Sequence, residues 1–273
     1  MSSIPHKTEN GNEIFDSATK FLKEFQVGKL LFQCNAGKTK GIPVMDIFRY
    51  LFCLIFSDRS MYMQRKTGAF EGGFCKNTVY RFLNNTKTNW QRFTTLLSAR
   101  IINNFMKPLT SDNRKDVFII DDSLFDRSRS CKTELLARVF DHCSMKYKRG
   151  YRMLTLGWSD GNSFVPVNHC LLSAAEDKNL LCEASSYDGR SLAGKRRRQS
   201  RRKATEVMLE LIHMAQKSGL SAKYVLFDSW FSSPKVVAAL KQEHGLDTIA
   251  MVKKSSKIKY GYQDGRFNLQ QKP

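Results

Sequence analysis

Residues 117–123 read Val-Phe-Ile-Ile-Asp-Asp-Ser, an apolar run that stops at two carboxylates and a hydroxyl group. Residues 224–229, Tyr-Val-Leu-Phe-Asp-Ser, repeat this design. Short runs rich in β-branched and aromatic residues predict buried strands. In α/β sheets, active sites form outside strand ends, where carboxylates from neighbouring strands converge. We therefore expect the carboxylates of Asp122 and Asp228 to lie close together on adjacent strands, although Asp228 by itself would serve equally well as the cap of a turn or helix.

The surrounding sequence predicts an α/β domain that contains both strands. A Ser-Asp-Gly-Asn turn at 159–162 separates two alternating runs and predicts a hairpin. Apolar residues at helical spacing follow the hairpin, and a proline begins a second helix. The order strand, hairpin, helix, strand, helix, strand is that of the ribonuclease-H-like fold, which we expect for residues 116–255. The predicted strands are 117–120, 151–158, 164–172, 224–227 and 248–252, and the predicted helices are 204–217 and 234–242.

The first 115 residues show helical periodicity, which predicts an all-α N-terminal domain. A short helix over 75–84 follows the Gly72-Gly73 break and keeps three polar residues away from Val79 and Phe82. Such a helix suits the DNA-reading element of a helix-turn-helix, and a plain packing helix explains the pattern about as well. The polar residues expected to contact DNA are Lys76, Asn77 and Arg81, and the other predicted helices are 15–27, 43–56 and 90–106.

The charge balance indicates a polyanionic partner. Forty-five Lys and Arg residues against 25 Asp and Glu residues give a net charge of +20. Nucleic acid is the first expectation for such a surplus, and an anionic membrane surface is the second. The longest apolar stretch, 50–56, is too short to span a bilayer, and residues 1–6 lack the pattern of a secretory signal. We expect a cytoplasmic protein that does not cross membranes.

The most basic segment is 195–203, where seven of nine residues are cationic. We expect a polar loop that contacts DNA phosphates, because each neutralised phosphate releases counterions and adds sequence-independent affinity. A solvated loop without a partner is the alternative. The salt dependence of DNA binding is the slope of the logarithm of the binding constant against the logarithm of the salt concentration. If all five arginines contact phosphates, replacing them with alanine should reduce the magnitude of this logarithmic salt slope by up to ~4–5 units. The expected DNA-binding residues are Lys195, Arg196, Arg197, Arg198, Arg201, Arg202 and Lys203.

Six short motifs occur in the order and spacing seen in one family of enzymes. They are Ile120-Asp121-Asp122-Ser123, Phe140-Asp141-His142, Lys148-Arg149-Gly150-Tyr151, residues 156–161, Pro166-Val167 and Asp228-Ser229-Trp230-Phe231. On these motifs the chain resembles bacterial insertion-sequence transposases of the Asp-Asp-Glu type, and most closely insertion-sequence family four. The resemblance implies a ribonuclease-H-like catalytic core that depends on Mg²⁺ or Mn²⁺ and acts in the bacterial nucleoid. It also implies a homodimer on DNA that cleaves the terminal inverted repeats of an element and transfers the strands to target DNA.

The resemblance assigns roles to individual acids. Asp122 matches the first catalytic, metal-binding acid, because the family follows this acid with Ser or Thr and Ser123 stands here. Asp121 is the alternative for the first acid, and Asp228 matches the second. The third acid, a glutamate that follows a strand-rich insertion, has no match. Residues 256–273 resemble only the start of that insertion, so we expect a chain truncated before the glutamate.

Two carboxylates in place of three should position one metal ion poorly, so we expect this chain to bind DNA and to cleave it little. Robust cleavage that depends on Asp228 would require a third ligand among Glu243, Asp247 and Asp264. A second hypothesis is a non-catalytic, DNA-binding remnant of a transposase. A third is a two-carboxylate nuclease unrelated to transposition, and the lack of a spare acid cluster in the sequence argues against it.

Overall fold

The computed structural model of the chain describes residues 11–56, 60–68, 73–111, 113–252, 260–262 and 265–267. The chain divides into two compact units. We call them the helical unit, Met1–Ile101 with Tyr187–Lys195, and the sheet unit, Ile102–Ser186 with Arg196–Pro273. Among the described residues, none of the helices combines the length and the hydropathy that a bilayer span requires.

Within the described residues, six α-helices precede the sheet in the chain. They are α1 (Gly11–Glu24), α2 (Val27–Gln33), α3 (Val44–Leu54), α4 (Met61–Lys66), α5 (Lys76–Leu83) and α6 (Trp90–Ile101). Their apolar faces meet in a core that includes Leu30 and Leu31 of α2 and Ile47 of α3, all nearly inaccessible to solvent. Between α1 and α3, the rings of Phe21 and Phe52 stack with their centroids 5.6 Å apart. The predicted helical N-terminal region is therefore present.

The predicted helix over 15–27 is wrong in one respect, because the structure has two helices there. Gln26 has a φ of 49°, in the left-handed region, and the chain changes direction between α1 and α2 at this residue. A left-handed residue other than glycine leaves no signal in hydrophobic periodicity. This is why the sequence pattern missed α2. The helices predicted over 43–56, 75–84 and 90–106 are confirmed as α3, α5 and α6, with Ile102–Met106 continuing as a π-helix.

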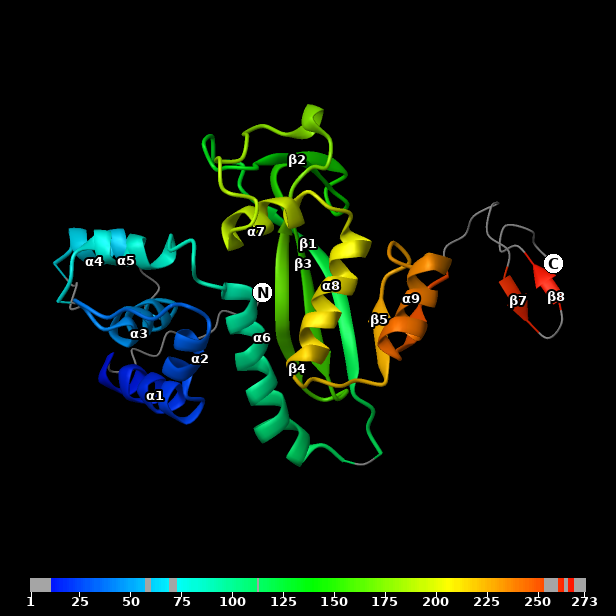
Figure 1. Ribbon diagram of the computed structural model, residues 1–273, viewed down its shortest axis with the longest axis horizontal. Coiled ribbons are helices and arrows are strands. Elements are labelled where there is room, and N and C mark those ends of the chain that lie inside the picture. Colours follow the sequence, from blue (N-terminus) through cyan, green and yellow to red (C-terminus); the bar gives the residue numbers. More distant parts are fainter. Residues whose placement is uncertain are drawn as a thin grey trace. The chain divides into compact units, whose positions relative to one another are not determined.

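The sheet unit contains a six-stranded mixed sheet (Figure 1). Its order is β2-β3-β1-β5-β6, and β4 pairs with β3. β1 is antiparallel to β3 and parallel to β5, and β5 is parallel to β6. This arrangement confirms the predicted ribonuclease-H-like core. The strands are β1 (Val117–Asp126), β2 (Ala137–Asp141), β3 (Lys146–Ser159), β4 (Phe164–Leu172), β5 (Tyr224–Phe227) and β6 (Asp247–Ala250).

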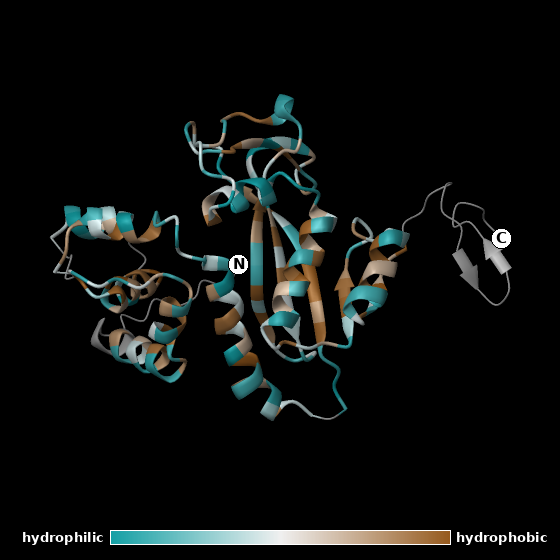
Figure 2. Cartoon of the chain, viewed as in Figure 1, coloured by the Kyte–Doolittle hydropathy of each residue, from teal (hydrophilic) through white to brown (hydrophobic). Residues whose placement is uncertain are grey.

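Helix α8 (Ala204–Lys217) covers one face of the sheet at β3 and β4, and α9 (Pro234–His244) packs against β6 (Figure 1). The covered face is apolar because alternate residues of β1 and β3 point toward it. β5 is hydrophobic along most of its length, as Figure 2 shows. The fully or almost fully buried side chains of this core include Phe118, Ile120, Leu154, Leu156, Trp158, Val207, Met208, Leu211 and Ile212.

Two elements of the sheet unit differ from the sequence prediction. β3 begins at Lys146, earlier than the predicted Tyr151, because its first residues pair with β2. β2 was not predicted, since its five residues, Ala-Arg-Val-Phe-Asp, place a carboxylate at a buried position and so break the alternation of apolar and polar residues. In the segment predicted to begin a strand-rich insertion, β7 (Tyr260–Tyr262) and β8 (Gly265–Phe267) form an antiparallel pair.

Asp160 holds the β3–β4 hairpin turn, and its replacement by alanine is expected to lower the free energy of unfolding by roughly 2–3 kcal/mol. The carboxylate is buried and accepts hydrogen bonds from the backbone N–H groups of Asn162 and Ser163 and from the Thr110 hydroxyl, over 2.8–3.0 Å. These bonds, led by that from Ser163, lower the pKa of Asp160 to about 2. Urea unfolding would measure the loss.

The depressed pKa of Asp160 also predicts the pH range of this effect. A lowered folded-state pKa contributes stability above the unfolded-state pKa, which is lost as the pH falls from about 4 through about 2. The matched control is Asp177→Ala, because the Asp177 side chain is 87% exposed and pairs only with Arg201 among the described residues. We expect the control to cost less than about 1 kcal/mol. Equal losses for the two variants would contradict the role of Asp160.

Candidate active site

Asp122 lies in the middle of β1. Its Cα is opposite that of Leu154 on β3, and the ladder continues until Asp126 faces Gly150. The prediction that this strand stops at the acids is therefore wrong, because the long strand β3 supplies backbone partners beyond them. Asp122 shares the α8-covered face of the sheet with Ile120, since alternate residues of a strand point to the same side. Its side chain is 20% exposed.

Asp228 is the first residue after β5, as the sequence predicts. The last residue of β5, Phe227, is paired with Ile120 of β1. The chain then turns, and the backbone N–H of Phe231 donates to the carbonyl of Asp228 over 3.0 Å. The carboxylate of Asp228 is exposed and accepts a 2.5 Å hydrogen bond from the backbone N–H of Ser229.

The register brings these two acids to neighbouring positions. Asp122 is two residues beyond Ile120, and Asp228 is one residue beyond Phe227. Adjacent strands lie about 4.8 Å apart, so Asp122 and Asp228 lie on neighbouring segments of backbone, just beyond the paired residues Ile120 and Phe227. Both acids follow the carboxyl ends of the parallel β1–β5 pairing, the edge at which open α/β sheets bind ligands.

Arg152 of β3 binds Asp122 and lies near Trp230, in the turn that follows Asp228. Its Nε donates to Oδ2 of Asp122 over 2.5 Å, and its Nη2 is bound to the same oxygen. Its guanidinium carbon also lies 5.7 Å from the ring centroid of Trp230, which is two residues after Asp228. The rings of Trp230 and His142 are 6.0 Å apart. Sequence reasoning missed Arg152, because nothing local in the sequence pairs it with a carboxylate 30 residues away.

Asp141, in the motif at 140–142, stabilises the turn that presents His142. Its carboxylate accepts hydrogen bonds from the Ser144 hydroxyl over 2.7 Å and the Cys143 backbone N–H over 3.1 Å. It also forms a 2.8 Å ion pair with Lys148. Lys148, followed by Ser144, holds the pKa of Asp141 well below its usual range. We assign this acid a structural role, which the motif alone did not indicate.

Asp121, the alternative first acid, lies on the other face of β1. Its Cα is opposite that of Thr155, and its side chain is exposed. Within the described residues it forms no hydrogen bond or ion pair. Asp122 and Asp121 thus differ in two ways that matter for chemistry: only Asp122 is held by a guanidinium group, and only Asp122 lies on the side of Arg152 and Trp230.

The donor atoms of Asp122 and Asp228 fit a hard divalent cation. Arg152 uses Oδ2 of Asp122, and Ser229 uses Oδ1 of Asp228, so each carboxylate keeps one oxygen that accepts nothing from the described residues. Mg²⁺ commonly binds through one or two carboxylates and completes its shell with waters and substrate phosphates. The described residues include no group of three or more His, Cys, Asp or Glu side chains able to hold a metal ion.

The three acids considered as further ligands do not join this pair within the described residues. Asp247 pairs with Tyr224, at the opposite end of β5 from Asp228, and forms an ion pair with Lys241. Glu243 lies near the last turn of α9, whereas the first turn of that helix follows Asp228 in the chain. Asp264 lies outside the described residues.

The basic segment 195–203 corrects a second prediction, because Leu192–Ser200 forms helix α7 instead of a loop. Arg and Lys are good helix formers, and charge alone does not indicate a loop. α7 is hydrophilic along its basic part (Figure 2). Arg197 forms a bidentate ion pair with Glu134, and Arg201 is bound to Asp177 and to two backbone carbonyls.

The remaining cations of the segment divide into two groups. Arg202 pairs with Glu206 and Glu210 of α8, and Arg196, which is half-buried, donates to Gln199. Internal partners therefore neutralise or bind four of the five arginines. The exposed cations without an ion-pair partner among the described residues are Lys195, Arg198 and Lys203.

Helix α5 presents the polar face that the sequence predicts. Thr78, Val79 and Phe82 are buried, while Lys76, Asn77 and Arg81 are exposed together with Tyr80 and Asn84. The Arg81 Nε donates to the carbonyl of Asn77 over 3.3 Å, which directs the guanidinium along the exposed side of the helix. The sequence predicts a glycine break before this helix. Gly73 has a φ of 62°, in the left-handed region, and Gly72 lies outside the described residues.

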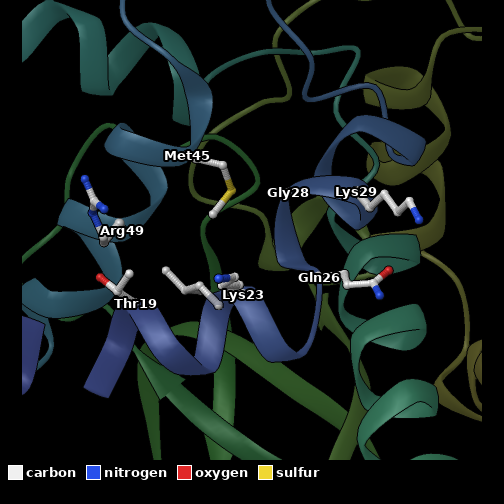
Figure 3. A pocket seen from close by; sticks show the side chains of 8 residues that line it. Thr19, Lys23, Gln26, Gly28, Lys29, Met45 and Arg49 are labelled. Carbon is white, nitrogen blue, oxygen red and sulfur yellow. The ribbon is translucent and has the colours of Figure 1, made fainter. Parts of the chain in front are cut away.

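Two cationic pockets have neither Asp122 nor Asp228 on their linings. One, of about 480 Å³, opens between α1, α2 and α3, with Lys23, Lys29 and Arg49 on its lining (Figure 3). The other, also about 480 Å³, lies in the sheet unit before β1 and β5, where Lys115 and Lys223 are exposed. The first has no carboxylate or thiol on its lining, so it offers no acid or nucleophile for catalysis. Neither pocket was predicted.

Comparison with known proteins supplies the family. The model of the DDE superfamily endonucleases matches residues 56–264, which include Asp122, Asp228 and the whole six-stranded sheet. No curated protein matches the chain at a significant level. The matched region covers most of the 273 residues. The chain therefore belongs to the DDE superfamily endonuclease family.

Proposed function

We propose that this protein is a DNA transposase of the bacterial insertion-sequence type, similar to family four, which cuts and joins strands at the ends of its element. The observation that carries the proposal is the pairing of β1 with β5, which gives Asp122 and Asp228 neighbouring positions at one edge of the sheet. The family membership and the net charge of +20 support DNA as the substrate.

In this proposal, Asp122 and Asp228 each offer a free carboxylate oxygen to Mg²⁺ or Mn²⁺. Such ions, when bound, activate the attacking oxygen and stabilise the leaving oxygen of an in-line phosphodiester displacement. The protein itself holds Asp122 within β1 and Asp228 directly after β5, and Arg152 supplies N–H donors beside Asp122. First water and then the 3′ hydroxyl of the cut strand would act as the attacking group, so that cleavage and strand transfer use the same carboxylates.

The second candidate function is a DNA-binding protein that occupies element ends without cutting them. It is favoured by one observation, that no third acid joins Asp122 and Asp228 among the described residues. A cleavage assay on plasmid DNA that carries the element's ends separates the two. The first proposal predicts slow nicking that requires Mg²⁺ or Mn²⁺ and leaves DNA binding intact in EDTA. Binding without any metal-dependent nicking would leave the second candidate.

Arg81→Ala is expected to reduce sequence-specific DNA binding by about 1–3 kcal/mol while it changes non-specific binding little. The reason is that Arg81 and Asn77 are exposed on α5, where their side chains would reach base edges in a major groove. Binding to sites selected from random DNA, compared with binding to unselected DNA, measures the difference. Lys87→Ala, which removes one exposed positive charge from the same unit, should weaken both by a similar small factor. An unchanged preference for the selected sites in Arg81→Ala would assign α5 to packing alone.

A further inference from the structure

Arg152 uses only part of its hydrogen-bonding capacity on Asp122. Nε and Nη2 both bind Oδ2 of the carboxylate, while Oδ1 is left free by the described residues. The guanidinium group has five N–H donors in a planar fork, so three remain for another acceptor. The two side chains are 28% and 20% exposed, which keeps them partly shielded and yet open to a ligand.

Trp230 gives this guanidinium a second contact. The guanidinium carbon lies 5.7 Å from the ring centroid, within the range of a cation–π attraction. The ring belongs to the turn that follows Asp228, and its residue is 53% exposed. One arginine therefore touches the first acid directly and touches the turn that carries the second acid through Trp230.

We propose that Arg152 is a positioning residue that makes metal binding at Asp122 depend on DNA, a role that rests on the proposed function above. Its positive charge neutralises Asp122 and repels a divalent cation in the absence of DNA. A DNA phosphate at the acid pair supplies the missing negative charge and accepts the remaining N–H donors of the guanidinium, as planar, charge-assisted bonding to phosphate allows. Trp230 keeps the guanidinium beside the phosphate while the metal ion takes the carboxylate.

The test is the dissociation constant of Mn²⁺, measured by electron paramagnetic resonance with and without a DNA duplex. Arg152→Gln is expected to bind Mn²⁺ about tenfold more tightly than the natural protein without DNA, because a like charge a few ångströms from the ion is removed. The gain in Mn²⁺ affinity on adding DNA should shrink by a similar factor. Cleavage should fall. A variant that merely damaged the fold would lose affinity and cleavage together.

Arg152→Lys is the second variant. It keeps the positive charge but lacks the planar set of N–H donors of the guanidinium group. We expect its Mn²⁺ affinity without DNA to stay within about twofold of the natural value, with cleavage reduced because an ammonium group lacks the planar contacts. The matched control is Arg149→Gln on the same strand, which removes an exposed charge that does not contact Asp122. Thermal unfolding of each variant shows that the fold persists.

Two results would overturn the proposal. Weaker or unchanged Mn²⁺ binding by Arg152→Gln would show that the guanidinium does not oppose the metal, and an unchanged response to DNA would show that it does not couple the two ligands. Failure of the proposed function is a separate outcome. It would appear as Mn²⁺ binding that survives Asp122→Asn, whatever Arg152→Gln does.

Discussion

Replacing Asp122 or Asp228 with asparagine is expected to weaken divalent-cation binding roughly a hundredfold and to lower the metal-dependent cleavage of DNA at least about 10²-fold. Asparagine has the shape of aspartate and keeps one carbonyl oxygen. It can still accept from Arg152 at position 122 and from the Ser229 N–H at position 228. The change therefore removes a negative charge and a ligand without removing the contacts that hold the side chain.

Calorimetric titration with Mn²⁺ and a single-turnover cleavage assay measure the two effects. The basal cleavage rate is expected to be low, since two described carboxylates are available where the metal ions of such sites use three. The effect of asparagine is measured as the ratio of the cleavage rate of the variant to that of the natural protein, so a low basal rate does not change the expected ratio. DNA binding in EDTA should be unchanged in both variants, because binding rests on cations and not on the acids.

Asp121→Asn is the matched control for this pair. It removes the same charge from the adjacent residue on the same strand, but from the exposed, opposite face of the sheet. We expect both metal affinity and cleavage to remain within about twofold of the natural values, because the exposed Asp121 carboxylate is on the opposite face from Asp122 and cannot act as a ligand beside it. Loss of activity in Asp121→Asn with retention in Asp122→Asn would instead assign the first acid to Asp121.

The triple variant Lys195→Ala, Arg198→Ala, Lys203→Ala is expected to reduce the logarithmic salt slope of DNA binding by about 2–3 units and to weaken binding near physiological salt roughly a hundredfold. These three cations are exposed and have no ion-pair partner among the described residues. Each phosphate that they neutralise contributes about 0.9 to the slope. This is less than the ~4–5 units expected from five arginines in an open loop, since internal carboxylates already pair with three of those arginines.

Titration of labelled DNA at several salt concentrations gives the slopes. The matched control replaces the exposed Lys20, Lys217 and Lys235 and removes the same total charge elsewhere. It should change the slope by less than about one unit. Arg197→Ala is an informative contrast, because it leaves Glu134 without its bidentate partner and should lower stability rather than the slope. Equal slopes for the triple variant and the natural protein would show that this segment faces solvent when DNA is bound.

Much of the fold follows from short-range patterns. The hairpin of β3 and β4, the helices α8 and α9, and the strands β1, β5 and β6 all appear near their predicted places. The reason is that a strand or helix with one buried face must carry apolar residues at the period of that element. The local sequence therefore shows which face is buried. The position of Asp228 directly after β5 was predictable on the same ground, because the apolar run ends there. The same pattern failed for β1, because β3 supplies pairing partners beyond Asp121.

The sequence by itself determined the α/β class, the basic character and the two candidate acids, whereas only the tertiary structure decided what each charge contacts. Asp122 meets Arg152 because β1 and β3 are paired, and Arg197 meets Glu134 across 63 residues of chain. Arg197 and Arg201 of the basic segment thereby take partners that are distant in the sequence, Glu134 and Asp177. Ion pairs of this kind have no period and no fixed sequence spacing. They depend on which elements become neighbours, and that is settled by the packing of the whole sheet and its helices.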